Sequence, residues 1–85
     1  MNWEEMREYV QPAIQSKVEE FHLYGFDRAS EAEVWECLRK KKWKRDEEPK
    51  PVREIMNDVL RLSISDYMSY ITVEAYKMPF DFPSS

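Results

Sequence analysis

The sequence is poor in the residues that build tight turns and covalent frameworks. Its 85 residues include one glycine, Gly25, and one cysteine, Cys37. A single glycine leaves little room for hairpin turns or a phosphate-cradling loop. A single cysteine excludes an intrachain disulfide framework and fits a reducing compartment. No apolar run reaches the roughly 18 residues that span a bilayer, and the N-terminus does not resemble a signal peptide. We therefore expect a cytoplasmic protein without membrane insertion.

Groups that perform catalysis are equally scarce. His22 is the single histidine, so a zinc site would need carboxylate ligands beside His22 and Cys37. A nucleophilic Cys37–His22 pair is conceivable, but no local motif or third member accompanies it. We expect His22 at the edge of the core beside Phe21, and Cys37 as a small apolar side chain. The prediction is a protein that is not an enzyme and that uses no metal and no cofactor.

Charge and helical periodicity are what the sequence has in quantity. Charged residues make up 35% of the chain and hydrophobic residues 42%, which is too apolar for a disordered protein. Apolar residues recur three and four positions apart, as on one face of a helix. We predict an all-α fold of one small four-helix domain over residues 1–78, followed by an extended C-terminal tail over residues 79–85.

The first predicted helix covers residues 3–24. Pro12 interrupts it, because proline removes a backbone hydrogen bond and clashes with the preceding turn. The apolar stripe nevertheless keeps its phase across Pro12, which favours a kinked helix or two collinear pieces. Gly25 is expected to end this helix as a left-handed cap, with Phe26 packing back.

Local signals place three further helices. The second begins at Ser30, in a capping box with Glu33, and either ends near residue 41 or lets its lysine stems snorkel along the core. Pro51 suits the first turn of the third helix. Ser63 is expected to cap the fourth helix, which makes the corner between the last two helices tight. The residues expected to face inward on the fourth helix are Ile64, Tyr67, Met68, Ile71 and Ala75.

The most unusual segment is the basic run Arg39-Lys40-Lys41-Lys42-Trp43-Lys44-Arg45. Six of the thirteen basic residues fall in these seven positions, so the run carries +6 and the other 78 residues carry −10, which gives the net charge of −4. A solvated helix end, a nucleic-acid contact and a contact with an acidic protein would each explain such a run. The acidic remainder disfavours duplex DNA, so single-stranded RNA is the nucleic acid that we expect.

Trp43 stands among these charges and separates the interpretations. It either packs beneath the following loop, which we favour because exposed tryptophans are uncommon, or presents its ring for stacking a base. If Trp43 is buried, the run is a charged corner without a stacking platform. Phe80 and Phe82, in the proline-flanked tail, are candidate residues for docking on a partner.

Several segments resemble one known family, the small bacterial post-transcriptional regulators (ComN-like competence regulators). The resemblance covers roughly residues 8–77 and is carried by residues 17–25, by residues 34–38 leading into the basic run, and by residues 55–60, 66–68 and 72–76. It implies a non-enzymatic regulator that lowers expression of a late-competence operon at the messenger level. It also implies association with the coiled-coil protein DivIVA at the cell pole or division septum. It supplies no RNA-contact residues.

Two functional hypotheses remain open at this point. In the first, a post-transcriptional regulator holds mRNA through Arg39–Arg45, with Trp43 stacking on a base. In the second, a protein-only adaptor docks on a DivIVA-like coiled coil through a groove between helices or through the Phe80/Phe82 tail. A homodimer would also bury part of the aromatic surface.

Overall fold

The computed structural model describes residues 1–77, and these form five α-helices without a strand. The helices are α1 (Trp3–Tyr9), α2 (Gln11–Leu23), α3 (Glu31–Lys41), α4 (Val52–Arg61) and α5 (Ile64–Lys77). The all-α prediction is confirmed, whereas the predicted number of four helices is wrong. The predicted tail, with Phe80 and Phe82, lies outside the described residues. Within residues 1–77, no helix is both long and apolar enough to cross a bilayer.

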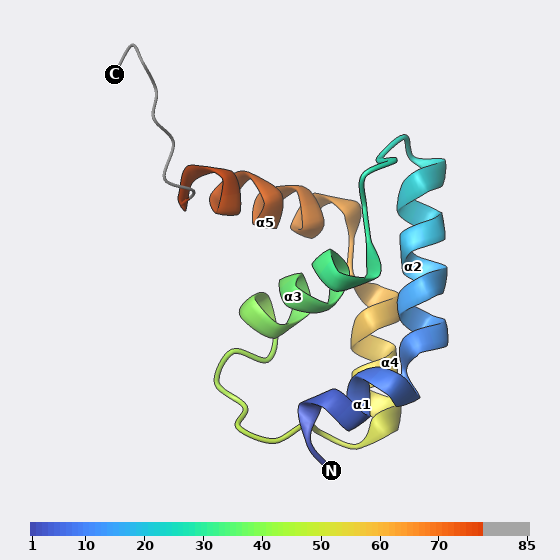
Figure 1. The fold of residues 1–85 in the computed structure, drawn as a ribbon, viewed down its shortest axis with the longest axis vertical. Coiled ribbons are helices and arrows are strands. Elements are labelled where there is room, and N and C mark those ends of the chain that lie inside the picture. Colours follow the sequence, from blue (N-terminus) through green and yellow to red (C-terminus); the bar gives the residue numbers. More distant parts are fainter. Residues whose placement is uncertain (78–85) are drawn as a thin grey trace.

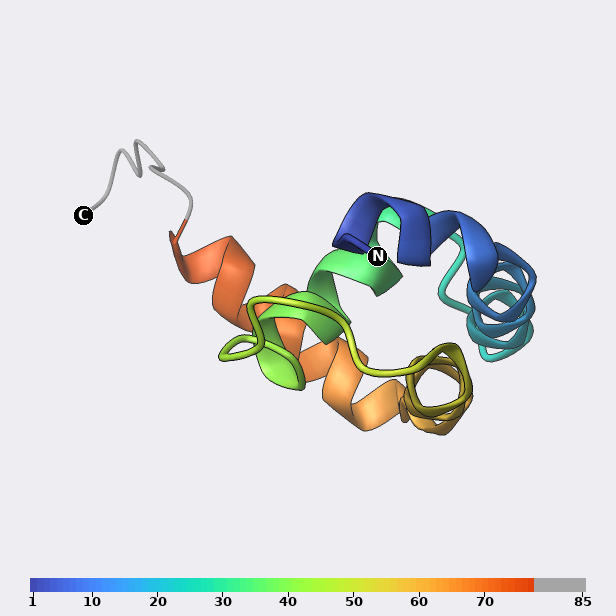
Figure 2. The same cartoon turned by 90° about the horizontal axis from the view of Figure 1, so that it is seen from below.

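The extra helix arises from a break at Val10, inside the predicted first helix. Val10 closes α1 and precedes α2, and Pro12 falls in the first turn of α2, where a missing N–H leaves no helical bond unmade. α1 runs across the axis of α2 in both views (Figures 1 and 2), so the two pieces are not collinear. Met6, Val10 and Ile14 are all buried. The apolar stripe continues from α1 into α2 without a change of phase. This is because Val10 lies at the corner between the two helices and packs in the core that both of them share.

The ends of α2 and α4 follow their local signals. Gly25 has a φ of 99°, and the N–H of Phe26 donates to the carbonyl of Phe21 at 2.9 Å, so the left-handed cap is confirmed. After α4, the Ser63 hydroxyl accepts from the N–H of Asp66 at 3.0 Å and starts α5. The predicted tight corner between these two helices is therefore present.

α3 begins and ends where predicted, but only half of the predicted capping box is present. Ser30 Oγ accepts from the N–H of Glu33 at 3.2 Å, while the Glu33 carboxylate accepts from the hydroxyl of Tyr67 at 3.2 Å. That second bond links α3 to α5 in place of the return bond of a capping box. The helix stops at Lys41, with Lys42 as its cap, so it ends before its lysines reach the buried face.

The core lies between α2, α3 and α4. α2 and α4 pack side by side, α3 packs on α2, and α5 packs on α3 and extends away from the other helices (Figures 1 and 2). On α5, Tyr67 and Tyr70 are buried, whereas Met68 and Ala75 are exposed. The prediction that Met68 and Ala75 face inward is wrong, because α5 packs on α3 and, through Tyr67, on Phe21 of α2, and both residues lie away from these contacts among the residues that the structure describes.

Lys17 is the charged side chain that this core buries, with 3% of its surface exposed. Its ammonium group donates to the carbonyl of Leu60, in the last turn of α4, at 2.8 Å and pairs with Glu20 at 3.3 Å. A cation at this end of a helix is favoured because the last carbonyls lack helical partners and carry partial negative charge. Lys17 thus ties α2 to the C-terminus of α4.

Candidate functional site

Three tryptophans meet beneath the basic run. Trp43 is completely buried. Its ring stacks on Trp3 of α1, with centroids 5.2 Å apart and planes inclined by 23°, and meets Trp35 of α3 edge-on at 5.4 Å. Trp3 and Trp35 also touch, at 6.0 Å. The prediction that Trp43 packs beneath the loop is confirmed, and the ring has no exposed face left on which a base could stack.

Hydrogen bonds fix the loop that follows Trp43. Nε1 of Trp43 donates to Oδ2 of Asp58, on α4, at 2.8 Å. Nε1 of Trp3 donates to the carbonyl oxygens of Glu47, at 3.1 Å, and Asp46, at 3.3 Å. The loop between α3 and α4 is therefore attached both to α1 and to α4, and it is held in one position relative to the helices.

Two of the six cations of the run are engaged within the protein. The guanidinium of Arg39 lies 4.2 Å from the centroid of the Trp3 ring, in a cation–π contact. Lys40 Nζ pairs with Oε1 of Glu74, on α5, at 3.0 Å. That hydrogen bond is the main reason why the pKa of Lys40 is raised. Arg39 and Lys40 thus help to position the run against α1 and α5.

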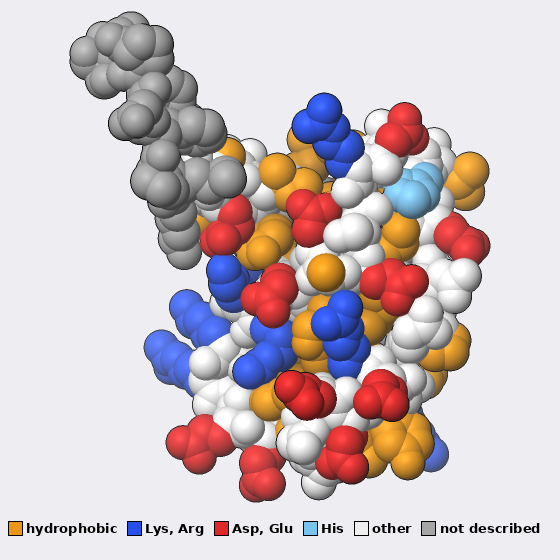
Figure 3. All heavy atoms as spheres, in the orientation of Figure 1, with side chains coloured by type: hydrophobic (Ala, Val, Ile, Leu, Met, Phe, Trp, Pro, Cys, Tyr) orange, Lys and Arg blue, Asp and Glu red, His pale blue; other side chains and the backbone are white. Residues whose placement is uncertain are grey.

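The other four cations face solvent. Lys41, Lys42, Lys44 and Arg45 are exposed and form no ion pair or hydrogen bond with any residue that the structure describes. We call these four residues the basic corner. Lys and Arg side chains gather over the end of α3 and the adjoining loop in Figure 3. The corner flanks Trp43 on both sides, so burial of the indole ring holds the charges outward.

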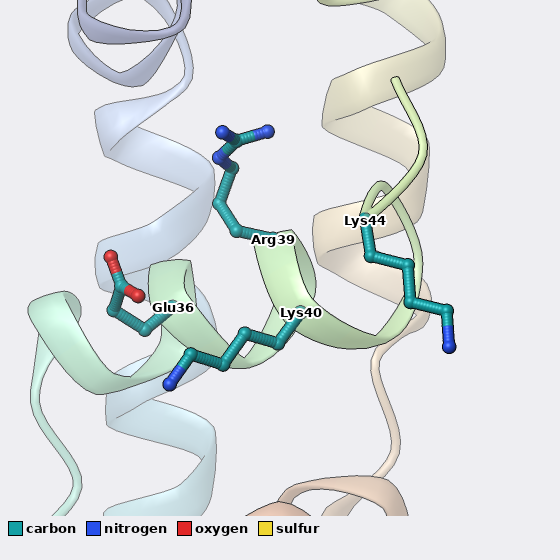
Figure 4. Close-up of a pocket in the computed structure, with 4 residues that line it drawn as sticks. All are labelled: Glu36, Arg39, Lys40 and Lys44. Carbon is teal, nitrogen blue, oxygen red and sulfur yellow. The ribbon is translucent and has the colours of Figure 1, made fainter. Parts of the chain in front are cut away.

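A shallow hollow of about 560 Å³ adjoins the corner and is lined by Glu36, Arg39, Lys40 and Lys44. Figure 4 shows that these side chains diverge: Arg39 points away from Lys40, and Lys44 projects to another side. A small anionic ligand requires polar groups that converge on it. Separated cations instead suit an extended polyanion, in which successive charges lie along a chain.

The Cys37–His22 pair is not arranged for nucleophilic catalysis. Cys37 is completely buried, and burial raises the pKa of its thiol to about 11. His22 Nε2 is engaged with the carbonyl of Ala29 at 2.9 Å. A reactive cysteine needs a lowered pKa and access to solvent. Cys37 is therefore a small apolar core residue, as predicted.

The residues that position the corner leave no local pattern in the sequence. Nothing in the chain around Trp3 pairs it with Trp43. Asp58 and Glu74 carried no signal, because each acts through a contact with a residue far away in the chain. Lys17 could have been found, since its spacing from Ile14 and Phe21 places it on the buried side of the first stripe.

Two comparisons with known proteins point to the same family. The family model described as "Post-transcriptional regulator" matches residues 3–85. The chain is 37% identical to the post-transcriptional regulator ComN of Bacillus subtilis (strain 168) over 71 residues, which cover 84% of this chain and 71% of ComN. No solved structure matches the chain.

Proposed function

Because the chain belongs to the post-transcriptional regulator family, we propose that it acts on messenger RNA directly and holds it through the basic corner. One observation carries the proposal. Four exposed cations without a partner among the described residues stand at the end of α3 and on the loop that Trp43 anchors. RNA phosphates are the ligands that such a row neutralises, with release of counterions.

The corner recognises phosphate rather than base. Trp43 is buried, and Trp35 is buried with it, so this part of the surface offers no freely exposed indole for stacking. Four phosphate contacts give a modest affinity that depends strongly on salt and weakly on sequence. The remainder of the chain is acidic, which favours a flexible single strand over a stiff duplex. The choice of transcript must then come from other surfaces or from another protein.

The test compares two variants with the same net charge. The corner variant replaces Lys41, Lys42, Lys44 and Arg45 by Gln. The control replaces four arginines that are exposed elsewhere on the protein by Gln as well: Arg7, Arg28, Arg53 and Arg61. Binding to a labelled single-stranded RNA at about 50 mM salt is measured by fluorescence anisotropy. We expect the corner variant to bind at least about tenfold more weakly and the control to stay within about threefold of wild type. Equal losses in both variants would refute a local site.

A second candidate function is that of an adaptor that binds protein only. A groove of about 530 Å³ lies between the loop 25–29 and α5, with Phe26, Ala29 and Ile71 in its lining and Arg28 beside them. An apolar side chain from a DivIVA-like coiled coil would fit there, and such a partner would recruit the protein to the cell pole or septum. An Ile71→Ser variant that loses the purified coiled coil but keeps RNA would separate this function from the first.

A further inference from the structure

Trp3 lies between two flat partners. The ring of Trp43 stacks on one of its faces, with centroids 5.2 Å apart and planes inclined by 23°. Trp35 is steeply inclined to both rings, by 67° and 61°, so it packs beside this stack and not within it. The guanidinium carbon of Arg39 lies 4.2 Å from the Trp3 centroid, which is too close for an approach in the plane of the ring. Because Trp43 fills one face of Trp3, Arg39 lies against the other face and forms the outermost layer of the stack.

The outer face of Arg39 borders the hollow beside the basic corner. Arg39 keeps part of its surface in solvent, and its guanidinium forms no hydrogen bond or ion pair with any residue that the structure describes. It lines the hollow of about 560 Å³ together with Glu36, Lys40 and Lys44. A guanidinium is planar and stacks on flat rings, and RNA-binding proteins stack unpaired bases on arginine planes. The contact with Trp3 orders Arg39 in advance, so less side-chain entropy is lost when a base stacks on it.

Glu36 restricts what can enter this hollow. Its side chain is exposed, and its carboxylate accepts no hydrogen bond from a described residue. Figure 4 shows Glu36 and Arg39 projecting to one side of α3, whereas Lys40 and Lys44 project elsewhere. A carboxylate repels phosphate and can only accept hydrogen bonds, so the group beside it must be uncharged and must donate. A basic peptide would also donate, but Arg39, Lys40 and Lys44 would repel it.

We propose that the hollow binds one unpaired guanine base, stacked on Arg39 and hydrogen-bonded to Glu36. This inference rests on the proposed function, because the basic corner would hold the neighbouring phosphates. Guanine carries two adjacent donors on its Watson–Crick edge, N1–H and the N2 amino group, and a carboxylate can accept both. Each of the other three bases sets an acceptor beside its donor, which would face the Glu36 carboxylate unpaired. The hollow thus supplies a base preference that the basic corner lacks.

The test measures one base at a time on a phosphate backbone. The probe is a labelled oligonucleotide of about eleven abasic residues, with guanine, hypoxanthine or no base at its centre. Hypoxanthine is guanine without the N2 amino group. Binding of the full chain at about 50 mM salt is measured by fluorescence anisotropy. We expect guanine to bind at least about tenfold more tightly than the bare backbone, and hypoxanthine at least about threefold more weakly than guanine.

Two variants separate the two contacts. Arg39→Lys keeps the charge but removes the planar group, so the advantage of guanine over the bare backbone should fall by about tenfold. Glu36→Ala keeps the stacking surface and removes the acceptor, so guanine and hypoxanthine should bind alike. The matched control is Arg53→Lys, at an exposed arginine of α4, and it should keep the ratios of wild type. Circular dichroism and thermal unfolding verify that each variant is folded.

Equal affinity for the guanine probe and the bare backbone would overturn the proposal, even if that affinity falls with salt as the basic corner predicts. A guanine advantage that survives Arg39→Lys, or that Arg53→Lys reduces equally, would refute Arg39 as the stacking surface. Equal binding of guanine and hypoxanthine by wild type would refute Glu36 as the group that selects guanine. Binding of the guanine probe without any binding of the bare backbone would support the base site and refute the basic corner, so the two proposals fail separately.

Discussion

The indole rings of Trp3 and Trp43 stack with their centroids 5.2 Å apart and so join the first helix to the loop after α3. This contact explains how an aromatic residue can stand in the middle of a basic run. The ring is the anchor, and the cations on either side remain in solvent. A row of lysines on a free loop would lose conformational entropy on binding; on an anchored loop, the backbone part of that cost is removed in advance.

The first prediction concerns the anchor itself. Trp43→Ala removes a completely buried ring and should lower the free energy of unfolding by about 3–5 kcal/mol. Trp43→Phe keeps most of the apolar contacts but removes the donor to Asp58, and should cost about 1–2 kcal/mol. Urea denaturation measures both. Leu23→Ala, at a side chain that is 87% exposed, should change stability by less than about 0.5 kcal/mol. A loss of less than about 0.5 kcal/mol in Trp43→Ala would contradict the role of the buried Trp43 ring as the anchor of the loop.

The second prediction concerns the loop. Trp3→Phe keeps a ring beside Trp43 but loses the hydrogen bonds to the carbonyls of Asp46 and Glu47. Losing about 1 kcal/mol of local stability should open the loop roughly fivefold more often. Trypsin should then cleave after Lys44 and Arg45 correspondingly faster.

Trp35→Phe is the matched control for the loop, because the Trp35 Nε1 has no hydrogen-bond partner among the described residues. Its cleavage rate should stay close to that of wild type when both proteins are well below their unfolding transitions. Equal acceleration in the two variants would show that the Trp3 hydrogen bonds do not hold the loop.

The third prediction concerns the buried cation. Lys17→Met keeps an unbranched apolar stem but leaves the carbonyl of Leu60 without its donor. The cost should be about 1.5–3 kcal/mol, the usual contribution of a hydrogen bond that involves a charged group. Lys17→Arg provides a check by thermal unfolding, since it retains the charge in a bulkier group and should recover part of the loss. A Met variant as stable as wild type would mean that the contact with α4 contributes nothing.

The local part of this fold was predictable from the sequence. Ser30, Gly25 and Ser63 mark helix ends through their own backbone and side-chain chemistry, and each does so in the structure. The break at Val10 was not predictable, because a residue at a corner that packs in the core of both helices leaves the apolar phase unchanged. The exposure of Met68 was missed for a different reason. Periodicity shows that a helix has an apolar side, but not whether another helix is present to cover it.

The candidate site, like the fold, was predictable from the sequence only in part. The basic run is visible in the composition, and the end of α3 near residue 41 follows from its lysines meeting the apolar stripe. The division of the cations into two that are engaged and four that have no partner among the described residues depends on Trp3 and Glu74, which lie far from the run in the chain. Contacts of that kind are set by the tertiary arrangement and leave no local pattern.

The fourth prediction concerns pH. Burial raises the pKa of the Cys37 thiol from its ordinary value of 9.0 to about 11. Below pH 9 the thiol is protonated in both the folded and the unfolded chain, so its contribution to stability is fully present. As pH rises towards 11, the unfolded chain ionises first, and about 2 kcal/mol of stability is lost.

Cys37→Ala isolates this effect, because it removes the titrating group at a cost that does not depend on pH. The difference in unfolding free energy between wild type and Cys37→Ala should therefore change between pH 8 and pH 11. A constant difference would contradict the burial of the thiol. Iodoacetamide at pH 8 should likewise label Cys37 only after the chain is unfolded.

The most direct test of the central claim is the salt dependence of RNA binding. Four phosphate contacts to a single strand predict that the logarithm of the association constant falls against the logarithm of salt concentration with a slope of about −3. The slope should approach zero in the Lys41/Lys42/Lys44/Arg45→Gln variant and remain near −3 in the Arg7/Arg28/Arg53/Arg61→Gln control. No RNA binding by wild type at about 50 mM salt, or a slope near −3 that survives in the corner variant, would contradict the claim that the basic corner holds RNA.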